Sequence, residues 1–220
     1  MEKELSILMA DLTGYTAMTD VHGGASAAQI VNRYMKIVDS ALYGTTKVVQ
    51  RIGDQVVMIA ENALDLMTTA TQINALTLEE NHFLSIHAGM HYGPIFIEKG
   101  DLFGSTINVA ARIMNIASRG QILGSSSFLS QVPAAQQHLF KSIGIHKLKN
   151  VMNTIELFEL QHSPDTSITN VDPVCHMHIS STQNKITLSY QGINYQFCSD
   201  RCMSIFQDSP ERFISEKQHL

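Results

Sequence analysis

Asn108 and Arg112 are residues whose types and spacing suggest chemistry. They lie four positions apart, so on a helix their side chains share one face. Apolar residues surround both, which predicts that most of this helix is buried. An arginine there needs an anionic partner or an open cleft, because burying an unpaired charge is costly. For an isolated pair the better interpretation is a structural arginine with a carboxylate partner, but this pair is not isolated.

Two aspartates stand at the ends of predicted strands. Asp11 ends a buried strand over residues 5–11, and Asp54 lies in the turn of a predicted hairpin. Each has an ordinary alternative role, since an aspartate at such a place also serves as a helix cap or a turn residue. If the hairpin packs beside the first strand, however, the two carboxylates can hold two divalent ions.

The chemistry of this set of residues is phosphoryl chemistry. Two divalent ions activate an attacking oxygen and neutralise a polyphosphate, while an arginine stabilises charge on a transferring phosphorus. The sequence contains neither a Gly-x-x-x-x-Gly-Lys-Ser/Thr loop nor a serine hydrolase elbow. His87 and His91 alternate along one strand and could bind a metal, but an ordinary strand is the favoured explanation because no third ligand is near in the sequence. A nucleoside triphosphate is the expected substrate.

The elements that position these residues follow a recognisable order. The pattern β-α-β-β-α-β, continued by β, α, β, α, β and β, predicts an α+β fold with helices on one face of a mainly antiparallel, ferredoxin-like sheet. The expected helices span 25–41, 62–79 and the Asn108–Arg112 segment, and the expected strands include 83–91, 94–97, 143–149 and 154–160.

The composition is that of an ordinary globular protein. The chain has 220 residues, of which 44% are hydrophobic and 16% charged, with a net charge of −5. The mild acidity argues against a nucleic-acid partner. No signal peptide or membrane-length apolar run is apparent, so we expect no membrane association and a cytoplasmic location.

Residues 1–160 resemble a class III nucleotide cyclase catalytic domain. The matching segments occur in the family's order: Met9–Thr16, Ile52–Asp54, Gly89–Gly93, Gly100–Gly104, Asn108–Arg112 and Gly120–Leu123. The resemblance implies cyclisation of ATP to cAMP with loss of pyrophosphate, as an adenylate cyclase in signal transduction. It also implies a head-to-tail homodimer whose active sites take residues from both chains.

The resemblance assigns a role to each matching residue. Asp11 and Asp54, with the Leu12 carbonyl, would hold two Mg²⁺ or Mn²⁺ ions. Asn108 would orient the ribose and Arg112 would stabilise the pentavalent phosphorus. The triphosphate would be bound by a lysine of the His-Lys-Leu-Lys-Asn segment, Lys149 or Lys147.

Base selection is where the sequence departs from the family. Adenylate-forming members have a lysine four residues before the second metal aspartate, where this chain has Gln50. The acidic partner is kept as Asp101. Glutamine can donate to the adenine ring nitrogen and the carboxylate can accept from an exocyclic amine, so adenine is favoured. A pyrimidine base in the substrate is also possible, whereas guanine fits these two side chains less well. The loop from Gly93 to Asp101 is also short for the family.

The three cysteines lie in a second module, residues 171–220, after a polar linker over 161–170. Cys175, Cys198 and Cys202 have a spacing suited to Zn²⁺, Cu⁺ or an iron–sulfur cluster. The fourth ligand would be His176 or His178. The module resembles the YHS domain, related to the TRASH fold, and so small a unit would gain stability from a metal. Three buried thiols without metal are the alternative.

Two functions follow from these observations. The first is a nucleotide cyclase whose C-terminal module regulates it. The second is a catalytically degenerate cyclase fold that binds a nucleotide or a partner and is coupled to a metal or redox sensor. Gln50 favours the second, while the complete set of Asp11, Asp54, Asn108 and Arg112 favours the first.

Overall fold

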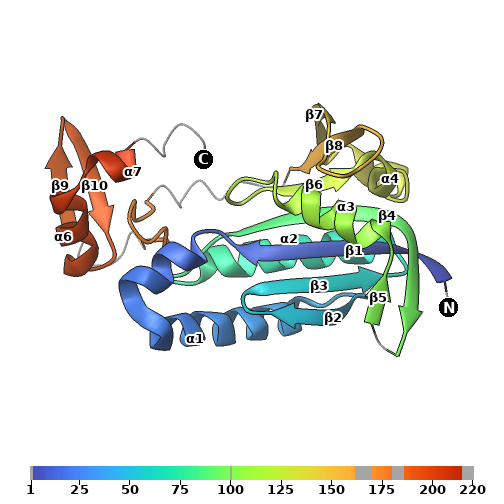
Figure 1. The fold of residues 1–220 in the computed structure, drawn as a ribbon, viewed down its shortest axis with the longest axis horizontal. Helices are drawn as coiled ribbons and strands as arrows, with labels where there is room; N and C mark the ends of the chain where they lie inside the picture. Colours follow the sequence, from blue (N-terminus) through green and yellow to red (C-terminus); the bar gives the residue numbers. More distant parts are fainter. Residues whose placement is uncertain (1, 100, 162–169, 180–185, 215–220) are drawn as a thin grey trace.

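The computed structural model describes residues 2–99, 101–161, 170–179 and 186–214. Its centre is an eight-stranded sheet in the order β2-β3-β1-β4-β6-β8-β7, with β5 paired to β4 (Figure 1). The strands are β1 (Glu2–Leu12), β2 (Lys47–Ile52), β3 (Gln55–Ala60), β4 (Ile86–Glu98), β5 (Asp101–Phe103), β6 (Ile122–Ser125), β7 (Phe140–His146) and β8 (Ile155–Leu160). The helices are α1 (Tyr15–Ala41), α2 (Ala63–Glu79), α3 (Ser105–Met114), α4 (Ser126–Leu129) and α5 (Ala134–Gln137). The α+β class predicted from the sequence is confirmed.

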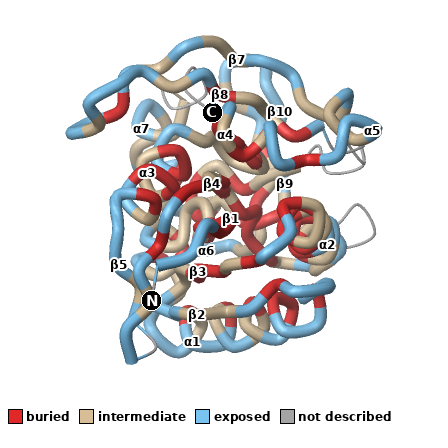
Figure 2. The backbone as a smooth tube through the Cα atoms, turned by 90° about the vertical axis from the view of Figure 1, so that its right-hand side faces the viewer, coloured by how far each residue is buried: buried red, intermediate tan, exposed pale blue. Residues whose placement is uncertain are grey.

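The central strand β1 faces two hydrophobic cores. Its even-numbered residues from Leu8 to Leu12 pack with α1 and α2, and its odd-numbered residues from Leu5 to Met9 pack with α3. The prediction that the helices cover one face is therefore wrong for α3. Figure 2 shows α2 and α3 on opposite sides of β1 and β4. Because both faces are covered, residues 5–10 form a continuous buried run.

Strand β4 is longer than predicted. It continues through Tyr92 and Gly93, where the sequence suggested a break between two strands, because β1 pairs with it from Leu12↔Ile86 to Glu2↔Phe96. The expected loop from Gly93 to Asp101 is thus mostly strand. The long pairing places Asp11, near the end of β1, beside the start of β4.

Helix α1 begins ten residues earlier than the predicted range of 25–41, at Tyr15. Gly14 precedes it in a left-handed conformation, and Gly23 interrupts it with φ 80° and ψ 169°. Glycine adopts such angles without the steric cost that a side chain would impose. The interruption divides α1 into a short segment, Tyr15–His22, and a long amphipathic one, which explains why the apolar periodicity was visible only in the second.

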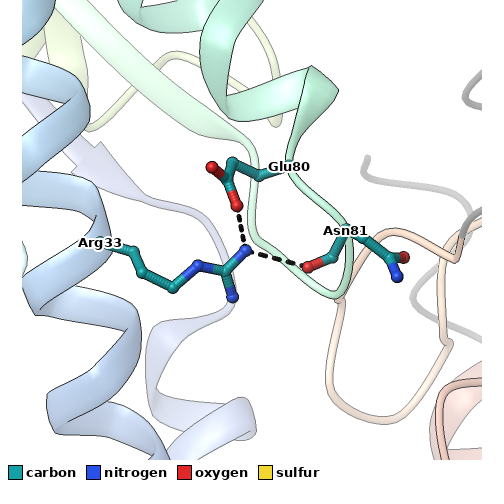
Figure 3. Close-up of polar contacts among 3 residues, drawn as sticks. All are labelled: Arg33, Glu80 and Asn81. Carbon is teal, nitrogen blue, oxygen red and sulfur yellow. Dashed lines mark hydrogen bonds and ion pairs between the residues drawn. The ribbon is translucent and has the colours of Figure 1, made fainter.

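Arg33 joins α1 to the connection between α2 and β4 (Figure 3). Its guanidinium pairs with the carboxylate of Glu80 and donates to the carbonyl of Asn81, at 3.0 Å. It also lies 4.8 Å from the ring centroid of Phe83, a cation–π contact. This cluster holds residues 80–83 against α1, immediately before the start of β4.

The C-terminal module is a hairpin covered by short helices. Strands β9 (Ile186–Tyr190) and β10 (Ile193–Phe197) pair with each other, and α6 (Asp200–Asp208) and α7 (Glu211–Ile214) follow. Phe206 is fully buried among the rings of Tyr190, Tyr195, Phe197 and Phe213. Most of the linker expected over 161–170 lies outside the described residues. Within the part that the structure describes, no helix combines the length and apolar character needed to cross a bilayer.

Candidate active site and cysteine cluster

Asp11 and Asp54 lie together where neighbouring strands end. β1 pairs antiparallel with β3, with Ala10 opposite Val56, so the end of β1 meets the turn before β3. The pKa of Asp54 is raised to about 7, first by burial and then by the neighbouring carboxyl group of Asp11, while backbone hydrogen bonds from Asp54 and Leu12 oppose the rise.

The carboxyl pair is a suitable donor set for hard divalent cations. Two carboxylates this close repel one another, and a bound cation would remove that repulsion while a shared proton does so only partly. His87 lies opposite Asp11 on β4, and its Nδ1 is 3.0 Å from the Thr13 hydroxyl. The pKa of His87 is lowered overall, because burial lowers it by more than the charge of Asp54 raises it. A neutral His87 adds no positive charge to compete with a metal ion.

Helix α3 is held very close to β4. A Cβ atom at Gly89 would lie 2.3 Å from the Met114 nitrogen and 2.5 Å from the Ala110 oxygen, so only glycine permits this packing. Thr106 donates its hydroxyl to the Pro94 carbonyl, at 2.7 Å, and anchors the first turn. The helix position is therefore set by backbone contact.

Asn108 and Arg112 lie on the side of α3 opposite the sheet. Each is two positions from the buried Ala110, which is about 200° around the helix axis. Asn108 is exposed and Arg112 half-buried, while most of the helix is covered as predicted, since only Ser105 and Asn108 of its ten residues are exposed. Among the described residues, neither side chain forms a hydrogen bond or an ion pair. The interpretation as a structural arginine with a carboxylate partner in the same chain is thus not supported.

The residues expected to contact the base and the triphosphate are exposed. Gln50 follows an irregularity in the pairing of β2, and Asp101 begins β5. Their neighbours Val49 and Leu102 pack in the core under α3, beside Ile107 and Ala111 of that helix. Lys149 lies in an exposed turn after β7. Only neighbours of Gln50, Asp101, Asn108 and Arg112 in the sequence share this cluster, and among the described residues no hydrogen bond or ion pair joins these four side chains or Lys149 to one another.

His87 and His91 do not form a metal site with each other. The Nδ1 atom of His91 lies 2.7 Å from the Ser125 hydroxyl, and burial lowers its pKa to about 4. The contacts favour the explanation that both histidines are ordinary strand residues with hydroxyl partners.

The three cysteines form a second cluster, joined by a residue of the first domain. The sulfurs of Cys175, Cys198 and Cys202 and a ring nitrogen of His22 all lie within 4.8 Å of one another. Such a group of thiols and an imidazole is compatible with a soft metal ion. Hydrogen bonds from Cys175 and Cys198 lower the pKa of Cys202 to about 5.

The predicted fourth ligand is wrong. Of the described residues, His22 completes the group, and neither His176 nor His178 belongs to it. His178 is buried, with its Nε2 2.7 Å from the Ser85 hydroxyl, and burial lowers its pKa to about 4. His22 lies on α1, far away in the sequence, so no local spacing pointed to it. The sequence feature that could have drawn attention to His22 is the following Gly23–Gly24 pair, which marks a break in the helix.

Asp172 orients two of the cysteines. Its Oδ1 accepts from the backbone nitrogens of Val174 and Cys175, at 2.8 and 3.2 Å, and its Oδ2 accepts from the Cys198 nitrogen, at 2.7 Å. Burial raises the pKa of this carboxyl, which the three hydrogen bonds oppose. One carboxylate therefore connects the two loops that carry Cys175 and Cys198.

Comparison with known protein families accounts for both parts of the chain. Residues 1–161 match the adenylate and guanylate cyclase catalytic domain family, and residues 170–217 match the YHS domain family. The chain belongs to the cyclase family. Its cyclase domain is thus followed by a YHS domain, as the sequence predicted.

Individual relatives support the cyclase assignment. A pH-sensitive adenylate cyclase of Mycobacterium tuberculosis is 24% identical over 162 residues, which cover 72% of this chain and 41% of the relative. An adenylate cyclase of Glutamicibacter nicotianae is 28% identical over 115 residues, which cover 52% of this chain and 28% of the relative. The chain therefore spans less than half the length of these curated relatives.

Solved structures share the fold of the cyclase domain. A Trypanosoma brucei adenylate cyclase in its monomeric state has a TM-score of 0.67 at 17% identity, over 74% of this chain and 89% of that one. The guanylyl cyclase Cya2 has a TM-score of 0.64 at 16% identity, over 75% and 96%. Both adenylate- and guanylate-forming proteins thus share this fold.

Proposed function

We propose that the chain converts a nucleoside triphosphate, with ATP favoured, to a 3′,5′-cyclic nucleotide and pyrophosphate. The observation that carries this proposal is the pairing of Asp11 with Asp54 at the strand ends, together with an unpartnered Asn108 and Arg112 on the outer side of α3. Two acidic groups next to each other, and a half-buried arginine that has no anionic partner among the described residues, are both costly in free energy. A metal–triphosphate substrate would satisfy both.

The metal-binding residues in this proposal are Asp11, Asp54 and the carbonyl of Leu12. Two Mg²⁺ or Mn²⁺ ions bound there would supply Lewis acidity to the ribose 3′-hydroxyl and neutralise the triphosphate. Asp54 must lose its proton to serve as a ligand, because a protonated carboxyl is a poor ligand for a hard cation. Leu12 is buried, which would hold its carbonyl in a fixed position.

The remaining residues position and stabilise the reacting groups. In the reaction a bond forms between the 3′-oxygen and the α-phosphorus, the bond from that phosphorus to the leaving oxygen breaks, and the hydroxyl proton passes to solvent. Asn108 would hold the ribose by hydrogen bonds, and Arg112 would stabilise the charge that develops on the α-phosphate. Lys149 or Lys147 would contact the leaving pyrophosphate.

A homodimer with two shared sites is part of the proposal. Asn108 and Arg112 face away from their own sheet, and neither forms a hydrogen bond or an ion pair with another described residue. A second copy placed over α3 would bring its carboxyl pair to them. Phe96 and Phe103 form an exposed cross-strand pair, 44% and 52% accessible, and aromatic residues are enriched at protein interfaces.

The side chains of Gln50 and Asp101 favour ATP among the nucleoside triphosphates. Gln50 would donate to the adenine ring nitrogen and Asp101 would accept from the exocyclic amine. The curated relatives described above are adenylate cyclases, which supports the same choice. We expect the reaction in the cytoplasm, where nucleoside triphosphates and reduced thiols coexist.

A product assay tests the proposal. The purified chain is incubated with Mn²⁺ and ATP, GTP, CTP or UTP separately, and the products are identified by mass spectrometry. We expect a cyclic nucleotide and pyrophosphate, fastest from ATP. The absence of product from all four, in a folded dimer, would instead support the degenerate cyclase domain suggested by Gln50.

A further inference from the structure

The four atoms of the cysteine cluster have the spacing of a tetrahedral site. The Cys175–Cys198 and Cys198–Cys202 sulfur pairs are 3.4 and 3.6 Å apart. The Nε2 atom of His22 lies 3.5 Å from the Cys198 sulfur and 3.6 Å from the Cys202 sulfur. With Zn–S near 2.3 Å and Zn–N near 2.0 Å, a tetrahedron has edges of roughly 3.8 and 3.5 Å. Small shifts of the side chains would therefore admit a zinc ion.

The four residues come from separate elements of both domains. Cys175 lies in the turn after Asp172, Cys198 follows β10, and Cys202 lies on the first turn of α6. His22 ends the first segment of α1 in the cyclase domain. Figure 1 shows the C-terminal module at the end of the sheet where α1 begins. An ion in this cluster would join the two domains.

The contact between the domains does not rest on the cluster alone. The backbone nitrogen of His178 donates to the Phe83 carbonyl, at 2.8 Å, and the guanidinium of Arg119 donates to the His176 carbonyl, at 2.7 Å. Buried residues of the YHS domain, among them Val174 and Phe206, belong to the same hydrophobic core as α1 and α2. His22 is thus presented to the cysteines by a packed interface.

The segment of α1 that carries His22 is the first helical part of the chain after β1. Tyr15–His22 is bounded by Gly14 and Gly23, two glycines with positive φ, so its ends are the places where it can pivot. Asp11 lies just before this segment. The side chain of His176 also touches Gly14, since a Cβ there would lie 2.6 Å from the His176 Cβ. Both ends of the segment therefore contact the metal-binding module.

We propose that His22 is the fourth ligand of a zinc ion bound by Cys175, Cys198 and Cys202, and that this ion fixes the segment Tyr15–His22 against the YHS domain. Zinc occupancy then fixes the start of α1, which follows Asp11 at the end of β1. The assignment of the ligand is independent of the enzyme's activity, whereas its effect on turnover rests on the proposed cyclase function.

The ligand assignment is tested by metal binding to the full chain under reducing conditions. Zinc affinity is measured by competition with a chromophoric chelator, and Co²⁺ is used as a spectroscopic substitute. The wild type should bind one ion with the absorption of a tetrahedral thiolate site. His22→Ala should weaken binding by more than the roughly 10- to 100-fold that loss of an outer-shell partner costs. His22→Cys should restore it with stronger thiolate charge-transfer absorption.

The matched control is His138→Ala, which removes an exposed histidine after α5. It should bind Zn²⁺ and Co²⁺ as the wild type does. The ligand assignment is overturned if His22→Ala equals this control in affinity and Co²⁺ spectrum. It is also overturned if the fully reduced wild type binds no zinc.

The coupling is tested by hydrogen exchange of backbone amides with and without zinc. In the wild type, zinc should slow exchange both near Cys175 and in residues 15–22. In His22→Ala at saturating zinc, the slowing should persist near Cys175 and disappear from residues 15–22. Equal slowing of residues 15–22 in both proteins would overturn the coupling. If these results hold in a protein that forms no cyclic nucleotide, only the proposed cyclase function is refuted.

Discussion

The carboxyl groups of Asp11 and Asp54 lie next to each other where β1 meets the turn between β2 and β3, and the pKa of Asp54 rises to about 7. Without metal, the proton on Asp54 is bound more tightly in the folded chain than in the unfolded one. Its contribution to the free energy of unfolding is therefore present at low pH and is lost as pH rises toward 7. A divalent ion would reverse this dependence, because it binds the deprotonated pair.

We therefore expect Mg²⁺ to raise the melting temperature more at pH 8 than at pH 6. Mg²⁺ prefers oxygen ligands, so the cysteine cluster should not contribute to the difference. Calorimetry at both pH values measures the shift, with Asp54→Asn as the control that should show a small shift independent of pH. Equal shifts in the wild type at the two pH values would argue against Asp54 as the titrating ligand.

Mixing two inactive variants should restore activity. Asp54→Ala removes a metal ligand and Arg112→Ala removes the charge on the outer side of α3, so each homodimer should be inactive. A 1:1 mixture should recover about a quarter of wild-type activity, because half of the dimers hold one intact site of two. Turnover is measured by product formation and dimer exchange by native mass spectrometry. Mixed dimers without activity would contradict sites shared between chains.

Gln50→Ala should reduce discrimination between bases. Loss of one hydrogen bond of about 1 kcal/mol should lower kcat/KM for ATP roughly 5-fold, with a smaller effect on GTP. Gln131→Ala, an exposed glutamine after α4, should leave both values unchanged. Equal losses for ATP and GTP would show that Gln50 supports the fold or the triphosphate and does not read the base.

Two glycine substitutions should have opposite effects on stability. Gly89→Ala places a Cβ against the backbone of α3 and should destabilise the chain by about 1–3 kcal/mol. It should also lower activity, because Asn108 and Arg112 move with α3.

Gly24→Ala lies in a helix with open space around its Cβ and should stabilise the chain by about 0.5–1 kcal/mol. Urea titration measures both, and a neutral Gly89→Ala would mean that α3 moves freely away from β4.

Much of the fold was predictable because local sequence reports local structure. The apolar run ending at Asp11, the turn at Asp54 and the helical spacing of Asn108 and Arg112 each predicted an element that the structure contains. Errors occurred where a distant partner decided the outcome. Pairing with β1 carries β4 through Tyr92 and Gly93, and close backbone packing at Gly89 places α3 on the opposite face from α1 and α2.

Residue types at nearby positions were enough to predict the two families, the candidate catalytic residues and the three thiols of the second module. The roles of the catalytic residues stay predictions. That Asn108 and Arg112 face away from their own sheet, and that His22 stands beside Cys198 and Cys202, became visible only in the folded chain. A site formed across a domain interface depends on how two cores pack together, and no periodicity within either domain records that packing.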